Sequence, residues 1–303
     1  MSQLNTRSNQ RSLVLGLLAV GLWSTMATAF KWALAYNSPM QLITAAATVS
    51  WLFFAVSLAI NGRLSRVIEV PKALLWRCLI LGLLNPALYY WILFQAYDLL
   101  PAQDAMAINY TWGLTLPLIA ALFSKIAPTK SEVGLALLSY LGILIIVTDG
   151  DLRAFEFNAP VGVLLALAST IIWGLSWVLN ARFVDHHQLD PQVTLFLNFT
   201  AATPVLWLIT VLADGVIAMT WASILSGLYV GLFEMGIAFI LWMSALRLTD
   251  NPIRVSSLIF LAPPISLVLI TTVLGEPISQ STLLGLVVIL LGLAGQQLVS
   301  QSR

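Results

Sequence analysis

The chain has 303 residues, of which 59% are hydrophobic and only 9% are charged, and its mean hydropathy is +0.93. A soluble domain needs about a quarter charged residues to cover its surface, so the composition excludes a soluble protein and predicts a membrane protein. The formal net charge of +1 gives no basis for binding nucleic acid. The single cysteine, Cys78, excludes an internal disulfide framework and a cysteine metal cluster.

Ten apolar stretches of membrane-spanning length follow one another along the chain. A helix of about 20 apolar residues crosses the bilayer core, which is about 30 Å thick. The stretches that meet this criterion are 13–36, 39–60, 73–97, 102–124, 132–149, 160–182, 191–212, 220–246, 252–273 and 279–298. Pro39, Pro101, Pro160, Pro191 and Pro252 stand at or near five of their starts, where the missing N–H of proline costs nothing. We therefore predict an all-α polytopic membrane protein with ten transmembrane helices.

The basic residues predict how these helices are oriented, because cytoplasmic loops carry an excess of lysine and arginine. If the chain crosses the membrane ten times, most of its lysines and arginines fall on the same side of the membrane as the N-terminus. They are Arg7, Arg11, Arg63, Arg66, Lys72, Arg77, Lys125, Lys130, Arg182, Arg247, Arg254 and Arg303. Only Lys31 and Arg153 fall toward the other side. Both termini are therefore expected in the cytoplasm, with residues 1–12 as a cytoplasmic N-terminal tail and residues 149–159 outside.

The two halves of the chain resemble each other weakly, on either side of the long central connection. A shift of 149 residues places 79–100 on 228–249 without a gap. A shift of 150 residues places Trp23 on Trp173, in the first and sixth predicted helices. Each identity alone is weak, but two helix pairs that match at nearly one offset indicate an internal repeat.

We predict two five-helix repeats, in residues 13–150 and 160–298. An odd number of helices in each repeat inserts the second repeat upside down relative to the first. Inverted repeats are the architecture of alternating-access transporters, in which the substrate site lies near the membrane midplane between the repeats.

One acidic residue, Glu234, lies inside the apolar stretch 220–246. It is about 12 residues from the inner end of that helix, and therefore roughly 18 Å deep. Asn85, its partner under the 149-residue shift, lies at about the same depth. An ionised carboxylate in the middle of a membrane helix costs at least about 2.5–3.5 kcal/mol, and such groups generally face a cavity. We expect Glu234 to contact substrate or to carry protons.

Three tryptophans, Trp23, Trp112 and Trp173, lie roughly 15–20 Å from their helix ends, although tryptophan favours the membrane interfaces. Pro263 and Pro264 lie at the same level and predict a bend in the ninth helix. Helical spacing brings further polar and aromatic side chains onto the same faces. These residues predict a central cavity suited to a small organic molecule with an apolar body and one or two polar groups. The candidate substrate-binding residues are Trp23, Asn85, Tyr89, Asn109, Trp112, Trp173, Trp177 and Glu234.

Each candidate also has a structural interpretation. A tryptophan at the midplane often packs between helices, and an asparagine there can join two helices by hydrogen bonds. Lys31 is a candidate counter-ion for Glu234, with a possible role in charge or proton coupling, but its side chain could equally extend to the outer interface.

No motif of a membrane-embedded enzyme is present. His186 and His187, beside Asp185, are interpreted as part of a loop, and the sequence contains no nucleophile, metal-binding or phosphate-binding motif. We therefore expect no enzymatic activity, no cofactor and no metal. A sensor or scaffold remains an alternative, although neither would require inverted repeats around a polar midplane.

Three stretches resemble the EamA branch of the drug/metabolite transporter superfamily, and the resemblance covers essentially the whole chain. They are "LWSTMATAFKWAL" (22–34), "LWMSALRLTDNPIRVSSLIFLAPPISLVLITTVLGEPIS" (241–279) and "GLVVILLGLAGQQ" (285–297). The resemblance implies a ten-helix transporter of the bacterial inner membrane.

Within that branch, "INYTWGLTLPLI" (108–119) is similar to the "NYLWP" stretch of aromatic-amino-acid exporters. The similarity implies that Trp112, Tyr89 and Trp173 line the central cavity. Thr111 and Gly113 stand where that motif has leucine and proline, so the substrate can differ.

These observations together predict a secondary transporter that moves small organic metabolites by alternating access. Amino acids or related amphipathic compounds fit best, because no arginine or lysine other than Lys31 lies near the midplane to hold a phosphate or a nucleotide sugar. The resemblance favours export. A transporter of drugs or other cationic metabolites is an alternative. The expected partners are the small-molecule substrate and the lipid bilayer, and the sequence leaves the oligomeric state open, a monomer included.

Overall fold

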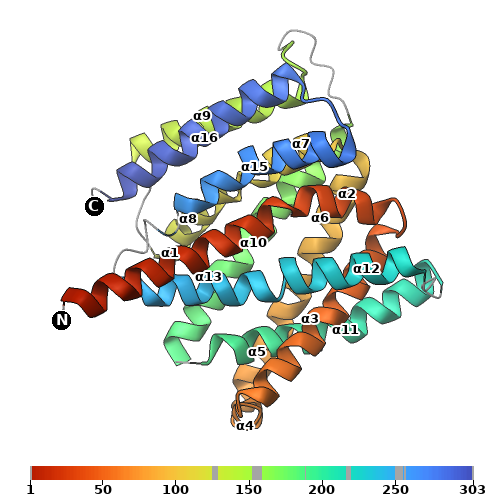
Figure 1. Ribbon diagram of the computed structural model, residues 1–303, viewed down its shortest axis with the longest axis vertical. Helices are drawn as coiled ribbons and strands as arrows, with labels where there is room; N and C mark the ends of the chain where they lie inside the picture. Colours follow the sequence, from red (N-terminus) through yellow and green to blue (C-terminus); the bar gives the residue numbers. More distant parts are fainter. Residues whose placement is uncertain are drawn as a thin grey trace.

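The computed structural model describes residues 2–124, 129–151, 159–187, 189–215, 220–249, 255 and 257–301. The helical elements of the first half are α1 (Ser2–Ser24), α2 (Met26–Leu34), α3 (Pro39–Ile60), α4 (Ser65–Ile68), α5 (Lys72–Gly82), η1 (Leu83–Leu88), α6 (Tyr89–Leu99), α7 (Ala102–Asn109), α8 (Trp112–Ser124) and α9 (Lys130–Val147). Those of the second half are α10 (Pro160–His187), α11 (Pro191–Ala213), α12 (Trp221–Tyr229), η2 (Val230–Glu234), α13 (Ile237–Leu248), η3 (Ser257–Leu261), α15 (Ala262–Leu269), η4 (Ile270–Leu274) and α16 (Gln280–Gln301). The described residues contain no strand, and the predicted all-α class is confirmed (Figure 1).

Six segments of the described chain are long and apolar enough to cross a membrane. They are Asn9–Leu34, Pro39–Ile60, Lys72–Leu99, Pro160–Asn180, Pro191–Ala213 and Trp221–Leu248. The shorter apolar helices are Val133–Val147, Leu258–Leu274 and Gln280–Gln296. Length and composition thus agree with a polytopic membrane protein, and the arrangement as ten spans in two inverted repeats stays a prediction.

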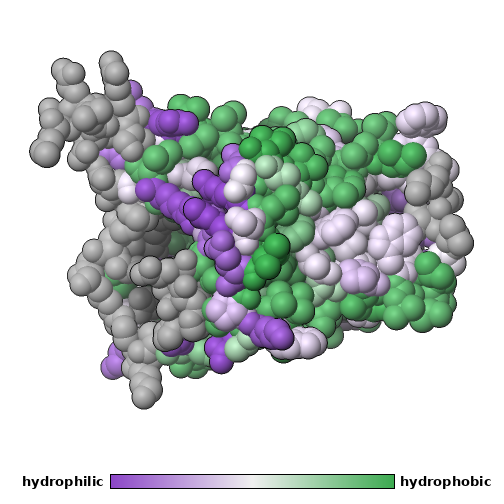
Figure 2. Space-filling model, turned by 90° about the horizontal axis from the view of Figure 1, so that it is seen from below, coloured by the Kyte–Doolittle hydropathy of each residue, from purple (hydrophilic) through white to green (hydrophobic). Residues whose placement is uncertain are grey.

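The surface of the protein also suits a lipid environment. Leu164, Leu212 and Leu291 are 66%, 77% and 61% exposed, whereas the polar residues Thr44 and Ser50 are fully buried. Figure 2 shows a broad hydrophobic surface with hydrophilic side chains gathered toward one end. An apolar exterior around a core that contains polar groups is what a bilayer, rather than water, stabilises.

Prolines begin several helices, as predicted. Pro39 is the first residue of α3, and the side chain of Ser38 before it accepts a hydrogen bond from the Gln41 N–H in a capping box. Pro191 begins α11 after the capping residue Asp190. Pro160 also begins its helix, α10. Pro101 immediately precedes α7, and Pro252 lies outside the described residues.

Several helices predicted to be continuous are broken. The first is divided at Thr25 between α1 and α2, and α1 begins at Ser2, so that the predicted N-terminal tail is helical. The third is interrupted by η1, where Asn85 has non-helical dihedrals (φ −147°, ψ 115°) before Pro86, since proline removes one backbone hydrogen bond. The fourth is divided at Tyr110–Thr111 and the eighth after η2. The ninth predicted helix changes from the 3₁₀-helix η3 to the α-helix α15 just before Pro263 and Pro264, where the sequence predicts a bend.

The interruptions of the third and eighth helices occupy corresponding places. The 149-residue shift superposes η1 and η2 partly and relates Asn85 to Glu234. It also relates Gly82 to Gly231, and each of these glycines touches the backbone of a neighbouring helix. A Cβ at Gly82 would lie 2.0 Å from the Asn198 carbonyl oxygen in α11, and one at Gly231 would lie 2.6 Å from the Ala46 carbonyl oxygen in α3. Neither site has room for a side chain.

The two ends of the helical bundle are distinguished by the chain termini. The first turns of α1 and the last turns of α16 lie at the same end (Figure 1). We call this end the terminal end, and the end that holds the α2–α3 and α6–α7 connections the opposite end.

Candidate functional site

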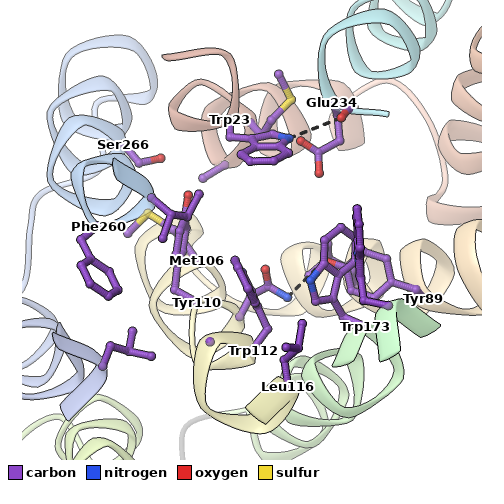
Figure 3. Close-up of a pocket in the computed structure, with 18 of the residues that line it drawn as sticks. Trp23, Tyr89, Met106, Tyr110, Trp112, Leu116, Trp173, Glu234, Phe260 and Ser266 are labelled. Carbon is purple, nitrogen blue, oxygen red and sulfur yellow. Dashed lines mark hydrogen bonds between the residues drawn. The ribbon is translucent and has the colours of Figure 1, made fainter. Parts of the chain in front are cut away.

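A cavity of about 550 Å³ lies near the middle of the bundle. Its volume is within the range of small-molecule binding sites, about 300–1,000 Å³. Rings form much of its wall, as Figure 3 shows. The predicted site residues that line it are Trp23, Tyr89, Asn109, Trp112, Trp173, Trp177 and Glu234. Further lining residues that the sequence analysis did not select include Met106, Tyr110, Trp242, Phe260, Ser266 and Gln296.

Glu234 is the acidic residue of this cavity. It ends η2 just before Gly236, where the backbone leaves helical geometry (φ −103°, ψ −85°). Its side chain is 8% exposed and its Oε1 accepts a hydrogen bond from the Tyr90 hydroxyl at 3.0 Å. The Trp23 indole N–H lies 3.4 Å from the Glu234 backbone carbonyl oxygen, so that α1 is tied to η2 beside the carboxylate (Figure 3). Among the described lining residues there is no lysine, arginine or histidine.

Aromatic rings surround the space next to this carboxylate. Trp173 is the central ring, with centroid distances of 4.7 Å to Tyr89, 6.2 Å to Trp112 and 5.4 Å to Trp177. In another part of the cavity wall, the ring centroids of Trp23 and Trp242 are 5.2 Å apart. The faces of such rings attract cations, most strongly where water is excluded. The wall can therefore accept an apolar group and, beside Glu234, a positive charge.

Asn109 supplies a polar group on the same wall. It is the last residue of α7, where the fourth predicted helix breaks, and its amide nitrogen donates to the Ser169 hydroxyl at 3.1 Å. A longer contact of 3.5 Å joins it to the Tyr89 hydroxyl. The break in the helix thus presents an amide to the cavity between α6 and α10.

Two predicted site residues do not lie in this cavity. Asn85 donates to the Ser176 hydroxyl at 3.0 Å and lines a second, smaller cavity. The Lys31 ammonium donates to the backbone carbonyls of Tyr97 and Leu100, both at 2.7 Å, at the end of α6. The structure therefore forms no Lys31–Glu234 ion pair, because the C-terminal carbonyls of a helix attract a cation and lie within reach of Lys31.

Sequence reasoning missed several polar residues at or beside the cavity, of which Tyr90 and Gln296 have the clearest roles. Tyr90 is fully buried and holds the Glu234 carboxylate, but in the sequence it stands beside Tyr89 with nothing to distinguish their roles. Gln296 lines the cavity from α16, is 4% exposed, and its side-chain nitrogen is buried without a hydrogen-bond partner. Because Gln296 lies near the end of the last predicted helix, the sequence indicates a residue at the membrane boundary rather than one that contacts a ligand.

The cavity is closed toward the opposite end. Its lining residues Phe30, Tyr97 and Met106 are only 3%, 4% and 1% exposed. Hydrogen bonds then join residues 102–104 at the start of α7 to residues 276–282 before and within α16, a set that we call the opposite-end latch. They run from the Ala102 N–H to Glu276 (3.0 Å), from the Gln103 amide N–H to the Pro277 carbonyl (3.0 Å), from the Ser279 N–H to the Gln103 amide oxygen (3.2 Å) and from the Thr282 hydroxyl to Asp104 (2.6 Å).

The lining residues nearer the terminal end are less buried. Leu116, Trp242, Ile259 and Phe260 are each partly exposed. The described residues contain no cluster of three His, Cys, Asp or Glu side chains that could hold a metal ion. The arrangement can therefore bind a small molecule by charge, hydrogen bonds and ring contacts.

The sequence model of the EamA-like transporter family matches residues 10–148 and again residues 160–295. The chain belongs to the EamA-like transporter family. Its expected place in the EamA branch is thereby confirmed, and the family name describes a transporter rather than an enzyme. Each match covers one half of the chain, with the boundary in the 149–159 connection.

Several relatives of the chain are named as transporters. The chain is 27% identical to the aromatic amino acid exporter YddG of Ancylobacter novellus, over 88% of this chain and 90% of that protein. It is 25% identical to the uncharacterized transporter YvbV of Bacillus subtilis, over 92% and 88% of the two chains. A probable amino-acid metabolite efflux pump of Salmonella typhimurium is 27% identical over 59% of this chain and 61% of its own.

A solved crystal structure has the same fold as this EamA-like protein. It superposes with a TM-score of 0.67 at 22% sequence identity and covers 96% of this chain and 98% of its own. The protein is thus a multi-pass membrane transporter by family, and the solved structure shows the same fold.

Proposed function

We propose that the protein is a secondary transporter that exports amino acids or related amphipathic amines across the bacterial inner membrane. The observation that carries the proposal is the buried Glu234 carboxylate in a cavity walled by aromatic rings. A substrate ammonium group lies against Glu234, and its apolar side chain lies against Trp173 and Tyr89. The names of two relatives, an aromatic amino acid exporter and an amino-acid metabolite efflux pump, support the same substrate class.

Glu234 holds the ammonium because its carboxylate is only partly engaged. Tyr90 donates to Oε1, and no described residue donates to the second carboxylate oxygen. Hydrogen bonds to a charged group contribute about 1.5–3 kcal/mol each, and aromatic faces add to the attraction for a cation. The Asn109 and Gln296 amides are available for the polar groups at the other end of the substrate.

Alternating access between two inverted repeats is the proposed mechanism. It is supported by the two matches of the family model, one to each half, and by the corresponding interruptions η1 and η2. Gly82 and Gly231 fit the same relation, because each brings its helix against the backbone of a helix from the other half. In the proposed cycle the opposite-end latch closes the site on one side while the terminal end gives access to it.

Both termini are proposed to be cytoplasmic, on the basis of the distribution of arginine and lysine. Most of the connection predicted to be external, residues 152–158, lies outside the described residues. Positions at the two ends of the bundle test the orientation instead. Gln280 begins α16 at the opposite end and Ser65 begins α4 at the terminal end, and both are exposed.

We expect Gln280→Cys to react with a membrane-impermeant maleimide in intact cells, and Ser65→Cys to react only after the membrane is opened. The native Cys78 is fully buried and gives little background. The reverse pattern of labelling would overturn the orientation.

Ring contacts in the cavity give a second prediction. Trp173→Ala and Trp112→Ala should each weaken binding of L-phenylalanine by about tenfold, because contact between aromatic rings contributes about 0.5–1.5 kcal/mol beyond the area that it buries. Isothermal titration of the purified variants measures the change. Trp221→Ala is the control, since this tryptophan is 80% exposed on the outside. If the cavity variants express poorly but bind normally, the two tryptophans serve packing.

Thermal stabilisation of the purified protein tests the substrate class. A ligand of the cavity stabilises the folded state by mass action, by about 2.7 kcal/mol at a hundred times its Kd. L-Phenylalanine and its decarboxylated analogue phenethylamine should raise the Tm, since both carry the ammonium group and the ring. If aromatic amino acids and amines leave the Tm unchanged, this proposal fails and a sensor or scaffold gains weight. Stabilisation by phenethylamine alone would favour a carrier of drugs or other cationic metabolites.

A further inference from the structure

A second cavity of about 320 Å³ lies beside the central one. It is formed between η1, α10, α11 and α13, and it shares Trp177 and Leu246 with the central cavity as common walls. Its volume is at the lower end of the range for small-molecule sites. Because Pro191 begins α11 and Arg247 belongs to the last turn of α13, this cavity lies toward the terminal end of the bundle.

Three amide side chains from three different elements meet in the second cavity. Asn85 of η1 donates to the Ser176 hydroxyl at 3.0 Å, and Asn180 donates to the Ser176 carbonyl at 2.9 Å. The Asn198 side chain from α11 lies 3.1 Å from that of Asn180. The second cavity therefore has a polar wall, and amides supply the N–H groups that bind carboxylate oxygens.

A positive charge lies at the edge of the same cavity. Arg247 lines it and is exposed, and the two salt bridges found among the described residues involve Arg63, Arg66 and Asp190 instead. The side-chain nitrogen of Trp177, in the wall between the two cavities, is buried and has no hydrogen-bond partner. Arginine binds carboxylates through two parallel N–H contacts.

The two cavities thus contain side chains of opposite type, one acidic and one basic. Glu234 lies in the central cavity, where no described lining residue is basic, whereas Arg247 lines the second cavity, where no described lining residue is acidic. The apolar residues Phe199, Phe239 and Met243 line the second cavity as well. A ligand for this cavity has a carboxylate and a compact apolar group.

We infer that the second cavity is a separate binding site for the carboxylate of the substrate, on its way between the cytoplasmic side and the central cavity. Arg247 binds the carboxylate, the apolar residues hold the side chain, and Trp177 separates this site from the central one. Asn85 then contacts substrate in the second cavity rather than beside Glu234. This inference rests on the proposed function for its occupant, a molecule with both an ammonium and a carboxylate group.

Two analogues of L-phenylalanine separate the sites. Phenethylamine keeps the ammonium and lacks the carboxylate, and 3-phenylpropionate keeps the carboxylate and lacks the ammonium. Titration calorimetry on the purified full chain should show that Arg247→Gln weakens binding of 3-phenylpropionate at least about tenfold, as loss of a charge-assisted hydrogen bond predicts. The same variant should bind phenethylamine with unchanged affinity.

The control is Arg66→Gln, which makes the same change of charge at an exposed arginine outside both cavities. Unchanged affinity of the Arg247→Gln variant for 3-phenylpropionate would overturn the inference, as would absence of its binding to the wild type or competition between the two analogues for one site. Arg247-dependent binding of 3-phenylpropionate without any binding of phenethylamine would contradict the proposed central site while supporting the second one.

Discussion

Glu234→Gln should raise the half-saturating concentration for L-phenylalanine about 10- to 100-fold. Glutamine has nearly the same shape and can still accept a hydrogen bond from Tyr90, but it lacks the charge that holds an ammonium group. Loss of a hydrogen bond to a charged group costs about 1.5–3 kcal/mol, and each 1.4 kcal/mol is a factor of ten in affinity. Efflux from proteoliposomes and titration of the purified variant both measure the change.

The analogues show whether the effect belongs to the ammonium group. Phenethylamine should lose affinity for the Glu234→Gln variant as L-phenylalanine does, and 3-phenylpropionate should not. Glu69→Gln is the matched control, because Glu69 is exposed and remote from the cavity lining. If the variant keeps its affinity for phenethylamine but loses accumulation driven by a pH gradient, Glu234 carries a proton instead of an ammonium group. If neither property changes, Glu234 has no part in transport.

Weakening the opposite-end latch should open the cavity to the outside. Glu276→Ala combined with Gln103→Ala removes the acceptor of the Ala102 N–H, the contact to the Pro277 carbonyl and the acceptor of the Ser279 N–H. Hydrogen bonds contribute about 0.5–1.5 kcal/mol each, and up to about 3 kcal/mol where a charge takes part. The three losses together should therefore shift the equilibrium between closed and open states at least about 10- to 100-fold.

A cysteine in place of Met106 reports this opening. Met106 lines the cavity near the latch and is 1% exposed, so an impermeant maleimide added to intact cells should label it slowly in the closed state. The latch variant should label at least about tenfold faster.

Ser38→Ala provides the control for this experiment. Ser38 caps α3 and donates to Asp214 at the same end of the bundle, but neither residue lines the cavity. Ser38→Ala should lower stability without faster labelling of the cysteine. If the latch variant loses stability to a similar degree and labels no faster, the hydrogen bonds only stabilise the fold.

The sequence predicts helices well where the local signals are strong. The second helix has its predicted bounds, 39–60, because Ser38, Pro39 and Gln41 set its start and the apolar run sets its length. The seventh begins at Pro191 for the same kind of reason. The composition of the cavity wall was also predictable, because tryptophan and glutamate at the midplane are costly or unusual unless they face such a space.

Tertiary packing decided what the sequence left open. Asn85 and Glu234 correspond under the 149-residue shift, yet they line different cavities, because each follows the local path of an interrupted helix. The partner of Lys31 was not predictable either. It binds carbonyl oxygens at the end of α6, and every residue has such an oxygen, so no residue type in the sequence marks the site.

Efflux of labelled L-phenylalanine from proteoliposomes tests most directly whether the central cavity is a transport site. The wild-type protein should release the label at a saturable rate. Phenethylamine on the same side of the membrane as the labelled substrate should inhibit this release. The Trp173→Ala and Glu234→Gln variants, reconstituted in equal amounts, should release it with higher half-saturating concentrations. Release at the same rate from protein-free liposomes, or equal kinetics for the wild type and both variants, would contradict the account.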